Sequence, residues 1–431
     1  MDNPSTEIAE QRVMTKMAWR LMPILIIMFL ISFIDRQNVG FAKLQMLHDL
    51  GMTEAAFGLA SSLFFIGYLL FEVPSTLALH KFGARLWLAR IMLTWGIITV
   101  LMGFTKSMPV FCVLRFALGV AEAGFYPGVI YYLTLWFPQS QRARVMGYFT
   151  LGSALANMLG SLVGGLLLGL SGTGGLAGWQ WVFIATGLPA VLVAFAVFRL
   201  LPASIQEARF LNPAEKSIAL AALQREQPAN PARTHPWKAL IDPRVLFFAF
   251  IYMLMSTSLY GVTYWMPTLV KSFGVSSTTN GLLNMLPWGL AALMLLWLPG
   301  KLRRSGSVVQ AMMIIAGVGT VCFIGSFLLG PTSLRFGALV LGGMCIPLLY
   351  PCFWFLPPRF FSGVRAAASV AAINSIGNLG GFLSQNLMPY VGKVSGTTTA
   401  PMIVPIVCLA LLGTGAFVIH TRDKRRMVQA A

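Results

Sequence analysis

Residues 21–41, LMPILIIMFLISFIDRQNVGF, decide the fold. The stretch is apolar up to Asp35, and a helix of about 20 such residues crosses the hydrocarbon core of a bilayer. Only helices and closed barrels can span a membrane, because every backbone polar group there must be satisfied internally. The alternating segments of about ten residues that are typical of a membrane barrel are absent. This stretch therefore predicts a transmembrane helix.

Eleven more apolar runs of similar length follow it. The longest polar stretch, 202–244, divides the twelve runs into six and six. We therefore predict an all-α integral membrane protein with twelve transmembrane helices. The eleven further runs lie at about 55–79, 86–105, 109–136, 145–170, 180–201, 245–270, 279–299, 308–330, 334–357, 366–391 and 401–420.

The two halves of the chain also resemble each other weakly. Three residues of the first half, Arg144, Asn157 and Gly160, recur 221 positions later as Arg365, Asn378 and Gly381. Such an offset is typical of two six-helix repeats, and a transporter built in this way binds its substrate between them. The predicted parts are a cytoplasmic tail at 1–20, a first six-helix bundle at 21–201, a cytoplasmic linker at 202–244, a second six-helix bundle at 245–421 and a basic cytoplasmic tail at 422–431.

The composition excludes a soluble or a disordered protein. Hydrophobic residues make up 57% of the chain and charged residues only 10%, against about 25% charged in soluble domains. Of the 31 Lys and Arg, 24 fall in gaps on the side of the termini and 5, including Lys43, fall in gaps on the other side. This asymmetry predicts a multi-pass protein of the cell inner membrane with both termini in the cytoplasm. The net charge of +18 thus reflects basic residues in the gaps between the apolar runs, which set the membrane orientation. We therefore expect no nucleic acid partner.

Besides Glu72 near the end of its run, four charged residues interrupt the apolar runs, namely Asp35, Arg36, Arg115 and Glu122. Each costs about 2.5–3.5 kcal/mol at the bilayer centre, so we expect them to face the bundle interior and to compensate one another. In the fourth run, the spacing of Arg115, Gly119, Glu122 and Tyr126 puts them on one helical face.

Two interpretations of these charges stay open. The acids and arginines can be neutral clamps between helices, Asp35 with Arg115 and Glu122 with Arg36. Alternatively they are functional: desolvation raises the pKa of a buried carboxyl and a nearby arginine lowers it, so the acids can change protonation during a cycle, whereas arginine stays positive. A cluster that becomes cationic when protonated favours an anion, and the guanidinium fork suits a carboxylate.

Further intramembrane polar groups are candidate contacts or structural groups. Glu72 lies near the cytoplasmic end of the second run, and we interpret it as structural, with Arg142 or Arg144 as its partner. The second half offers only neutral groups well inside its runs, and each is either interhelical glue or a substrate contact. These are Tyr260, Tyr264, Trp265, Asn284, Trp354, Asn374, Ser375, Asn378 and Gln385, and Tyr68 in the first half is a comparable case.

Several motifs carry a resemblance to known families. The loop Thr76–Arg85 resembles the cytoplasmic signature of the major facilitator superfamily, with Thr76 and His80 where the pattern has Gly and Asp. The segments Asp35–Ala42, Phe71–Ser75 and Arg115–Gly128 resemble the anion:cation symporter family of that superfamily. The short motifs Leu135–Pro138 and Gly178–Phe183 are similar to its tartrate, phthalate and hydroxyphenylacetate permeases.

The resemblance implies a major facilitator fold and proton-driven uptake of a carboxylate. By position it implies that Asp35 and Glu122 carry protons, that Arg36 and Arg115 bind or gate the substrate, and that Tyr68 lines the site. Either Asn374 or Asn378 falls on the substrate asparagine of the second half, and Tyr260 is a further candidate contact there. Ser153 stands where sugar-acid relatives often carry Gln, which disfavours a sugar acid.

We therefore predict a monomeric, proton-coupled symporter that imports a small mono- or dicarboxylate, such as tartrate, an aromatic acid or a sugar acid, by alternating access. Binding of Arg115 to the anion predicts that Arg115→Ala abolishes binding. A uniporter or an exporter of the same fold is the alternative. An enzyme or a sensor is disfavoured, because the sequence has no nucleophile–base pair, no metal-ligand cluster and no output domain. No cofactor and no metal are expected.

Overall fold

The structure is a computed structural model that describes residues 4–225, 242–305, 308–361 and 363–430. Within these ranges every regular element is helical. The first half contains α1 (Pro4–Asp49), α2 (Glu54–Phe82), α3 (Ala84–Met102), α4 (Met108–Glu122), α5 (Phe125–Thr134), α6 (Gln139–Leu168), η1 (Thr173–Gly175) and α7 (Gly178–Leu200). After α8 (Pro213–Arg225), the second half contains α10 (Pro243–Lys271), α11 (Ser277–Ser305), α12 (Val308–Leu328), α13 (Thr332–Trp354), α14 (Pro357–Phe360), α15 (Gly363–Ser395), η2 (Ala400–Met402) and α16 (Ile403–Ala430).

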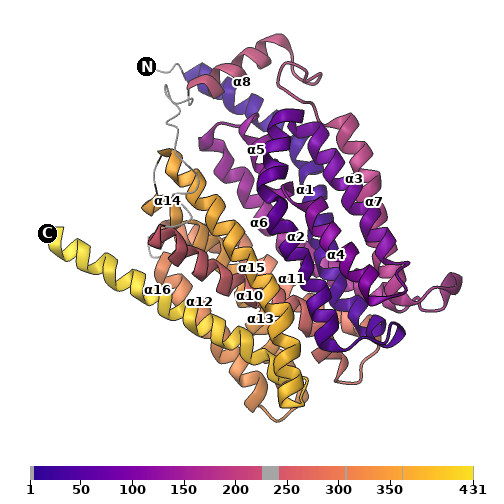
Figure 1. Cartoon of the computed structure of the whole chain (residues 1–431). Helices are drawn as coiled ribbons and strands as arrows, with labels where there is room; N and C mark the ends of the chain where they lie inside the picture. The colour runs from indigo at the N-terminus through magenta and orange to yellow at the C-terminus, as the bar shows by residue number, and fades with distance from the viewer. Residues whose placement is uncertain (1–3, 226–241, 306–307, 362, 431) are drawn as a thin grey trace.

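The helices form two bundles that lie side by side (Figure 1). Because α4 and α5 together make one crossing, each half contributes six crossings in the described part of the chain. The predicted twelve-helix, two-bundle fold is therefore confirmed. The bundles meet along α2 against α15, α6 against α11 and α1 against α10, and residues of these helices line the site described below.

One crossing helix differs from the others in composition. Eleven helices in the described ranges are long and apolar enough to cross a membrane, and α15 is not among them. With 33 residues, α15 is about 50 Å long at the usual rise of a helix, so its length suffices. Its polar side chains, which include Asn374, Ser375, Asn378 and Gln385, lower its hydropathy. A helix that faces the other bundle rather than lipid can carry such groups.

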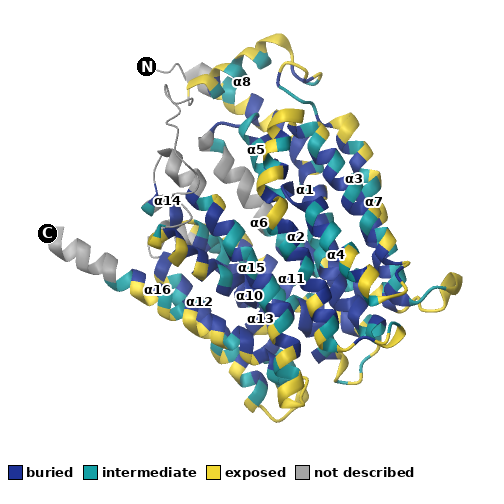
Figure 2. Ribbon diagram, viewed as in Figure 1, coloured by how far each residue is buried: buried dark blue, intermediate teal, exposed yellow. Residues whose placement is uncertain are grey.

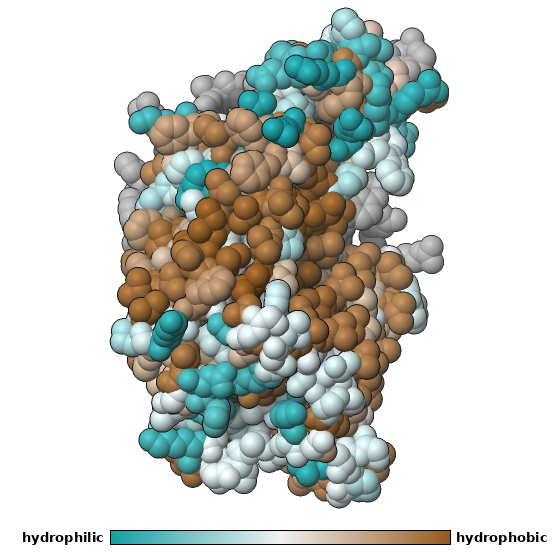
Figure 3. Space-filling model, turned by 90° about the vertical axis from the view of Figure 1, so that its right-hand side faces the viewer, coloured by the Kyte–Doolittle hydropathy of each residue, from teal (hydrophilic) through white to brown (hydrophobic). Residues whose placement is uncertain are grey.

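The surface of the molecule fits a bilayer. Figure 3 shows a broad hydrophobic band with hydrophilic groups above and below it. Large apolar side chains on the outer helices are exposed (Figure 2), among them Leu192 on α7 and Val321 on α12. A monomeric soluble protein rarely exposes apolar surface on this scale, so this band is the lipid-facing surface.

The helix predicted at 109–136 is interrupted in its middle. Helix α4 ends at Glu122 and α5 begins at Phe125, with Gly124 between them at φ +82°. An L side chain rarely adopts this left-handed conformation, and a Cβ at Gly124 would also overlap Ser75. The expectation that Arg115, Glu122 and Tyr126 share one continuous helix is therefore wrong. The break leaves Glu122 at a helix end inside the membrane.

The two bundles make their closest contacts near the helix ends that lie away from the chain termini, which we call the far side. There the backbones of Gly165 on α6 and Gly281 on α11 are so close that a Cβ on either would overlap the other. Lys43 also lies there. We expected it in a loop, but α1 continues to Asp49 and Lys43 is only 1% exposed.

Lys43 joins the bundles on the far side. Its Nζ is 3.0 Å from Glu54 Oε2 of the same half. It also lies 4.6 Å and 4.0 Å from the ring centroids of Tyr264 and Trp265 in the second half. A carboxylate and two rings compensate a buried ammonium. Two of the four candidate aromatic residues of the second half, Tyr264 and Trp265, therefore contact Lys43 at the far-side closure.

Helix α8 lies in the stretch expected to link the halves. It is fixed to the start of α1 by two ion pairs, Lys16 to Glu215 at 2.8 Å and Arg225 to Glu10 at 3.2 Å. The hydrogen bond from Lys16 holds the pKa of the Glu215 carboxyl below its usual range. Residues 226–241 of that stretch, with Pro228, Pro231 and Pro236, lie outside the described residues.

Candidate functional site

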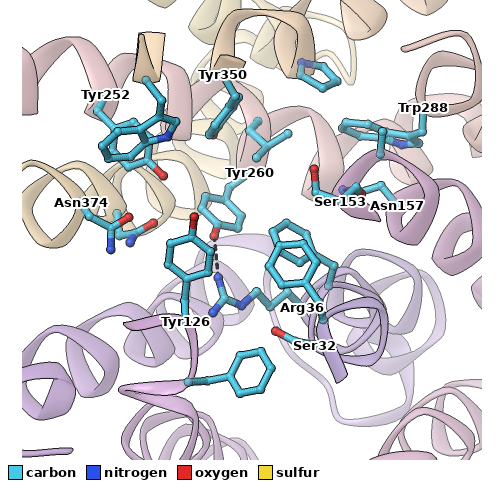
Figure 4. Close-up of a pocket in the computed structure, with 18 of the residues that line it drawn as sticks. Ser32, Arg36, Tyr126, Ser153, Asn157, Tyr252, Tyr260, Trp288, Tyr350 and Asn374 are labelled. Carbon is cyan, nitrogen blue, oxygen red and sulfur yellow. Dashed lines mark hydrogen bonds between the residues drawn. The ribbon is translucent and has the colours of Figure 1, made fainter. Parts of the chain in front are cut away.

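A cavity of about 120 Å³ lies between the two bundles (Figure 4). Along each helix, the lining residues lie closer than the far-side contacts to the side of the molecule on which the chain termini lie. On α6, for example, Ser153 and Asn157 line the cavity, whereas Gly165 makes the closure. The cavity is therefore closed on the far side. The described lining residues are Phe29, Ser32, Phe33, Arg36, Tyr68, Phe125, Tyr126, Ser153, Ala154, Asn157, Tyr252, Leu259, Tyr260, Trp288, Pro347, Tyr350, Trp354, Asn374 and Asn378.

Arg36 is the charged residue among these lining side chains, and it connects the two halves. Its Nη2 is 2.6 Å from Glu122 Oε1, and its Nε donates to the same oxygen at 2.7 Å. Its Nη1 donates to the Tyr260 hydroxyl of the second half at 3.1 Å. The rings of Phe33, Phe64 and Tyr68 lie 5.3–5.7 Å from its guanidinium carbon. Carboxylate and aromatic groups thus compensate this cation in the membrane.

Glu122 lies directly behind Arg36. The side chain is fully buried, and Ser32 Oγ donates to its Oε1 at 3.0 Å. Its other oxygen, Oε2, is buried without a hydrogen-bond partner in the described part of the chain. One oxygen therefore binds both Arg36 and Ser32, while the second makes no hydrogen bond to the described residues.

Asp35 points away from the cavity, into the first bundle. Its carboxylate accepts hydrogen bonds from Asn38 at 2.9 Å, from Thr99 on α3 at 3.1 Å and from Thr186 on α7 at 3.5 Å. Among the described residues no basic group lies within 4.0 Å of it. Three neutral donors thus hold this carboxylate, and no arginine pairs with it.

Arg115 is also separate from the cavity. Its Nη2 donates to the Ser61 carbonyl of α2 at 3.2 Å, and its guanidinium carbon lies 5.2 Å from the Phe64 ring. Its Nε and Nη1 have no hydrogen-bond partner in the described ranges. Of the two pairs considered from the sequence, the structure brings together Arg36 with Glu122, but does not bring Asp35 within ion-pair distance of Arg115.

The other predicted contacts distribute as follows. Tyr68 and Tyr260 line the cavity, and so do both Asn374 and Asn378. Composition and charge did not single out Ser32, Trp288, Tyr252 or Tyr350, which line it as well. A helix contributes only a few lining positions, and nothing in a neutral apolar run marks which of its faces meets the other bundle.

Glu72 crosses the interface between the halves. Its Oε1 accepts from Asn374 Nδ2 at 3.2 Å and its Oε2 from Ser375 Oγ at 2.6 Å, both on α15. The side chains of the partners expected from the sequence, Arg142 and Arg144, lie outside the described residues. The amide of Asn374, one of the two predicted substrate asparagines, thus already donates a hydrogen bond to Glu72.

We expect Glu72→Leu to lower the unfolding temperature of the detergent-purified protein. The substitution leaves the buried Asn374 amide without its acceptor, which costs about 1–3 kcal/mol, and it also removes the acceptor of the half-buried Ser375 hydroxyl. Glu72→Gln keeps an acceptor and is expected to lie closer to the parent protein. Glu207→Leu on the exposed rim is the matched control. Equal unfolding temperatures for Glu72→Leu and the parent would show that this contact does not stabilise the interface.

The fold and the site define the class of protein. A cavity between two six-helix bundles inside an apolar belt is the arrangement of a membrane transporter for small molecules. The chain belongs to the Major Facilitator Superfamily, whose family model matches residues 25–385. It is a multi-pass membrane protein and not an enzyme.

Similar proteins are named as transporters. The chain is 39% identical to a quinolone resistance transporter of Acinetobacter baumannii, over 97% of this chain and 98% of that one. It is 40% identical to a putative tartrate transporter of Agrobacterium vitis, over 90% of each chain. It is 37% identical to the putative metabolite transport protein NicT of Pseudomonas putida, over 92% of each chain.

Solved structures support the fold. A bacterial homologue of the human lysosomal transporter Spinster superposes with a TM-score of 0.72 at 16% identity, covering 92% of this chain and 96% of that one. The D-xylose–proton symporter superposes with a TM-score of 0.71 at 15% identity, covering 92% and 97%. At such identities the likeness concerns the fold alone.

Proposed function

We propose that this transporter imports a small organic anion together with protons across the cell inner membrane, by alternating access and as a monomer. The observation that carries the proposal is the ion pair of Arg36 with the fully buried Glu122 at the wall of the cavity. An ionised Glu122 competes with a substrate carboxylate for the same guanidinium. Protonation of Glu122 removes that competitor and leaves Arg36 free to bind the anion.

The exchange of partners couples the two ligands. Binding of the anion and binding of the proton favour each other. The proton on Glu122 leaves Arg36 without a counter-ion, which the anion then supplies, and the anion on Arg36 leaves Glu122 without its cation, which favours the neutral carboxyl. The loaded site is neutral, which lowers the cost of moving it through the membrane. Arg36 also donates to Tyr260 of the second half, so a change at Arg36 reaches both bundles. With the termini in the cytoplasm, the closed far side faces the periplasm and the cavity belongs to the inward-facing state.

Asp35 and Arg115 act within the first bundle in this proposal. Asp35 is a second proton-carrying residue, held by neutral donors that can serve either protonation state. Arg115, with two unpartnered nitrogens, sustains a positive potential behind the Arg36 site. Tyr68, Asn374 and Asn378 contact the substrate.

The test is transport into vesicles that contain the purified protein, with radiolabelled benzoate and tartrate as probes and protein-free vesicles to subtract passive leak of the protonated acid. With an interior more alkaline than the exterior, the proposal expects uphill accumulation of an anion that collapses on addition of a protonophore. Accumulation that ignores the pH gradient indicates a uniporter.

A relative named for quinolone resistance favours a second candidate, namely export of an organic anion. In the same vesicles, exchange of the anion against protons would require the opposite gradient, with an acidic interior. Dependence on that gradient would replace import by export.

A further inference from the structure

The walls of the cavity between the bundles are mainly aromatic. Ten of its nineteen described lining residues carry an aromatic ring, and both halves contribute five. In the second half Tyr252 lies 5.8 Å from Tyr350 and 5.2 Å from Trp354 between ring centroids, so part of the wall is a packed aromatic cluster. Such rings favour a flat ligand with a π face, through offset or edge-to-face contacts.

The same lining offers one charge. Arg36 is the sole ionisable cation or anion among the described lining residues, and its guanidinium can hold one carboxylate in bidentate fashion. A second carboxylate on the ligand would be desolvated without a partner, which is unfavourable in a buried site. The charge of the site therefore fits a monocarboxylate better than a dicarboxylate.

Two of the three lining asparagines already donate hydrogen bonds within the protein. The Asn157 amide donates to the Ser153 carbonyl at 2.8 Å, and the Asn374 amide donates to Glu72 at 3.2 Å. A polyhydroxylated ligand needs partners for each of its hydroxyl groups, because an unpaired polar group is costly in a buried site. The engagement of these two amides leaves fewer polar partners for such a ligand.

The size of the cavity fits a single ring. Its volume is about 120 Å³, comparable with a protein cavity of about 150 Å³ that is known to hold benzene. In Figure 4, Tyr252 and Tyr350 lie on the side of the cavity away from Ser32, with Arg36 and Tyr260 between them. A ring directed towards Tyr252 and Tyr350 can thus have its carboxylate at Arg36.

We infer that the substrate is an aromatic monocarboxylate with one ring, its carboxylate on Arg36 and its ring among the aromatic residues of the second half. This inference rests on the proposed function for the role of the cavity, and it adds the chemical class of the substrate. It excludes tartrate and sugar acids as preferred ligands.

The experiment measures the affinity of the detergent-purified, full-length protein for four probes by isothermal calorimetry at one pH. Benzoate is compared with cyclohexanecarboxylate, which lacks the π face, with phthalate, which adds a second carboxylate, and with tartrate, which has two carboxylates and no ring. We expect benzoate to bind at least tenfold more tightly than each of the other three. Tartrate or cyclohexanecarboxylate binding as tightly as benzoate, or more tightly, would refute the requirement for an aromatic ring. Phthalate binding as tightly as benzoate, or more tightly, would refute the preference for a single carboxylate.

A pair of variants tests the wall itself. Trp354→Leu is expected to reduce the preference for benzoate over cyclohexanecarboxylate severalfold, and Trp19→Leu, which alters an exposed side chain of α1 outside the cavity, is expected to leave it unchanged. An unchanged preference in folded Trp354→Leu contradicts the placement of the ring. Should Trp354→Leu fail to fold, the four-probe comparison on the parent protein still decides.

Failure of this inference is distinguishable from failure of the proposed function. Proton-driven accumulation of tartrate in vesicles would refute the aromatic class and keep symport. Selective benzoate binding without any response of transport to the pH gradient would refute symport and keep the aromatic class.

Discussion

Glu122→Gln is expected to abolish uphill accumulation while exchange of the anion persists. Glutamine has nearly the shape of the protonated acid but does not release a proton. In the variant Arg36 therefore has no ionised partner at 2.6 Å to return to, and anion binding no longer depends on protonation. Each proton that is coupled across one pH unit supplies about 1.4 kcal/mol, or about tenfold accumulation, and the variant should lose that factor.

The measurement compares accumulation with counterflow in the same vesicles. Counterflow exchanges labelled for unlabelled anion and needs no net proton movement, so Glu122→Gln should retain it. Asp35→Asn is the matched variant for the second buried acid. If Glu122→Gln accumulates anion as the parent does, Glu122 has no coupling role, and a loss confined to Asp35→Asn would assign the coupling to the acid in the first bundle.

The charged residues of the site could be predicted from the sequence, because a charged side chain inside the bilayer is energetically costly and therefore conspicuous. Asp35, Arg36, Arg115 and Glu122 stand out in apolar runs, since a bilayer tolerates such groups only for a reason. Their arrangement could not be anticipated. Adjacent residues on a helix point about 100° apart, so Arg36 faces the cavity while Asp35 faces α3 and α7. Which of the two faces inward depends on how α1 is rotated against its neighbours.

Contacts between distant helices were equally hidden. Glu72 and Asn374 are 302 positions apart in the chain, and no local pattern relates them. A lysine after an apolar run usually marks a membrane edge, so the sequence alone predicts Lys43 in a loop. Its burial depends on Glu54 and on two rings of the other bundle. The break at Gly124 had a signal, a glycine two residues after an intramembrane acid, but isolated glycines are common in membrane helices.

Arg36→Ala is expected to weaken anion binding by at least about 30-fold, since removal of one partner of a buried charge pair costs about 2–5 kcal/mol. Arg36 is the cation that reaches the cavity, whereas Arg115 donates to a carbonyl outside it. The geometry therefore predicts a smaller loss for Arg115→Ala than the complete loss expected from the resemblance. Calorimetry with benzoate on both variants ranks the two arginines.

Folding must be separated from binding, because Arg36→Ala alone leaves the Glu122 carboxylate buried without its cation. The double variant Arg36→Ala with Glu122→Gln removes both charges, so it leaves no uncompensated buried charge, which is what makes the loss of one partner alone strongly destabilising. We expect this double variant to recover the unfolding temperature of the parent and still to lack anion binding. Recovery of binding together with stability would mean that Arg36 only neutralises Glu122, as in a structural clamp. A deeper loss in Arg115→Ala than in the double variant would move the anion site from the cavity into the first bundle.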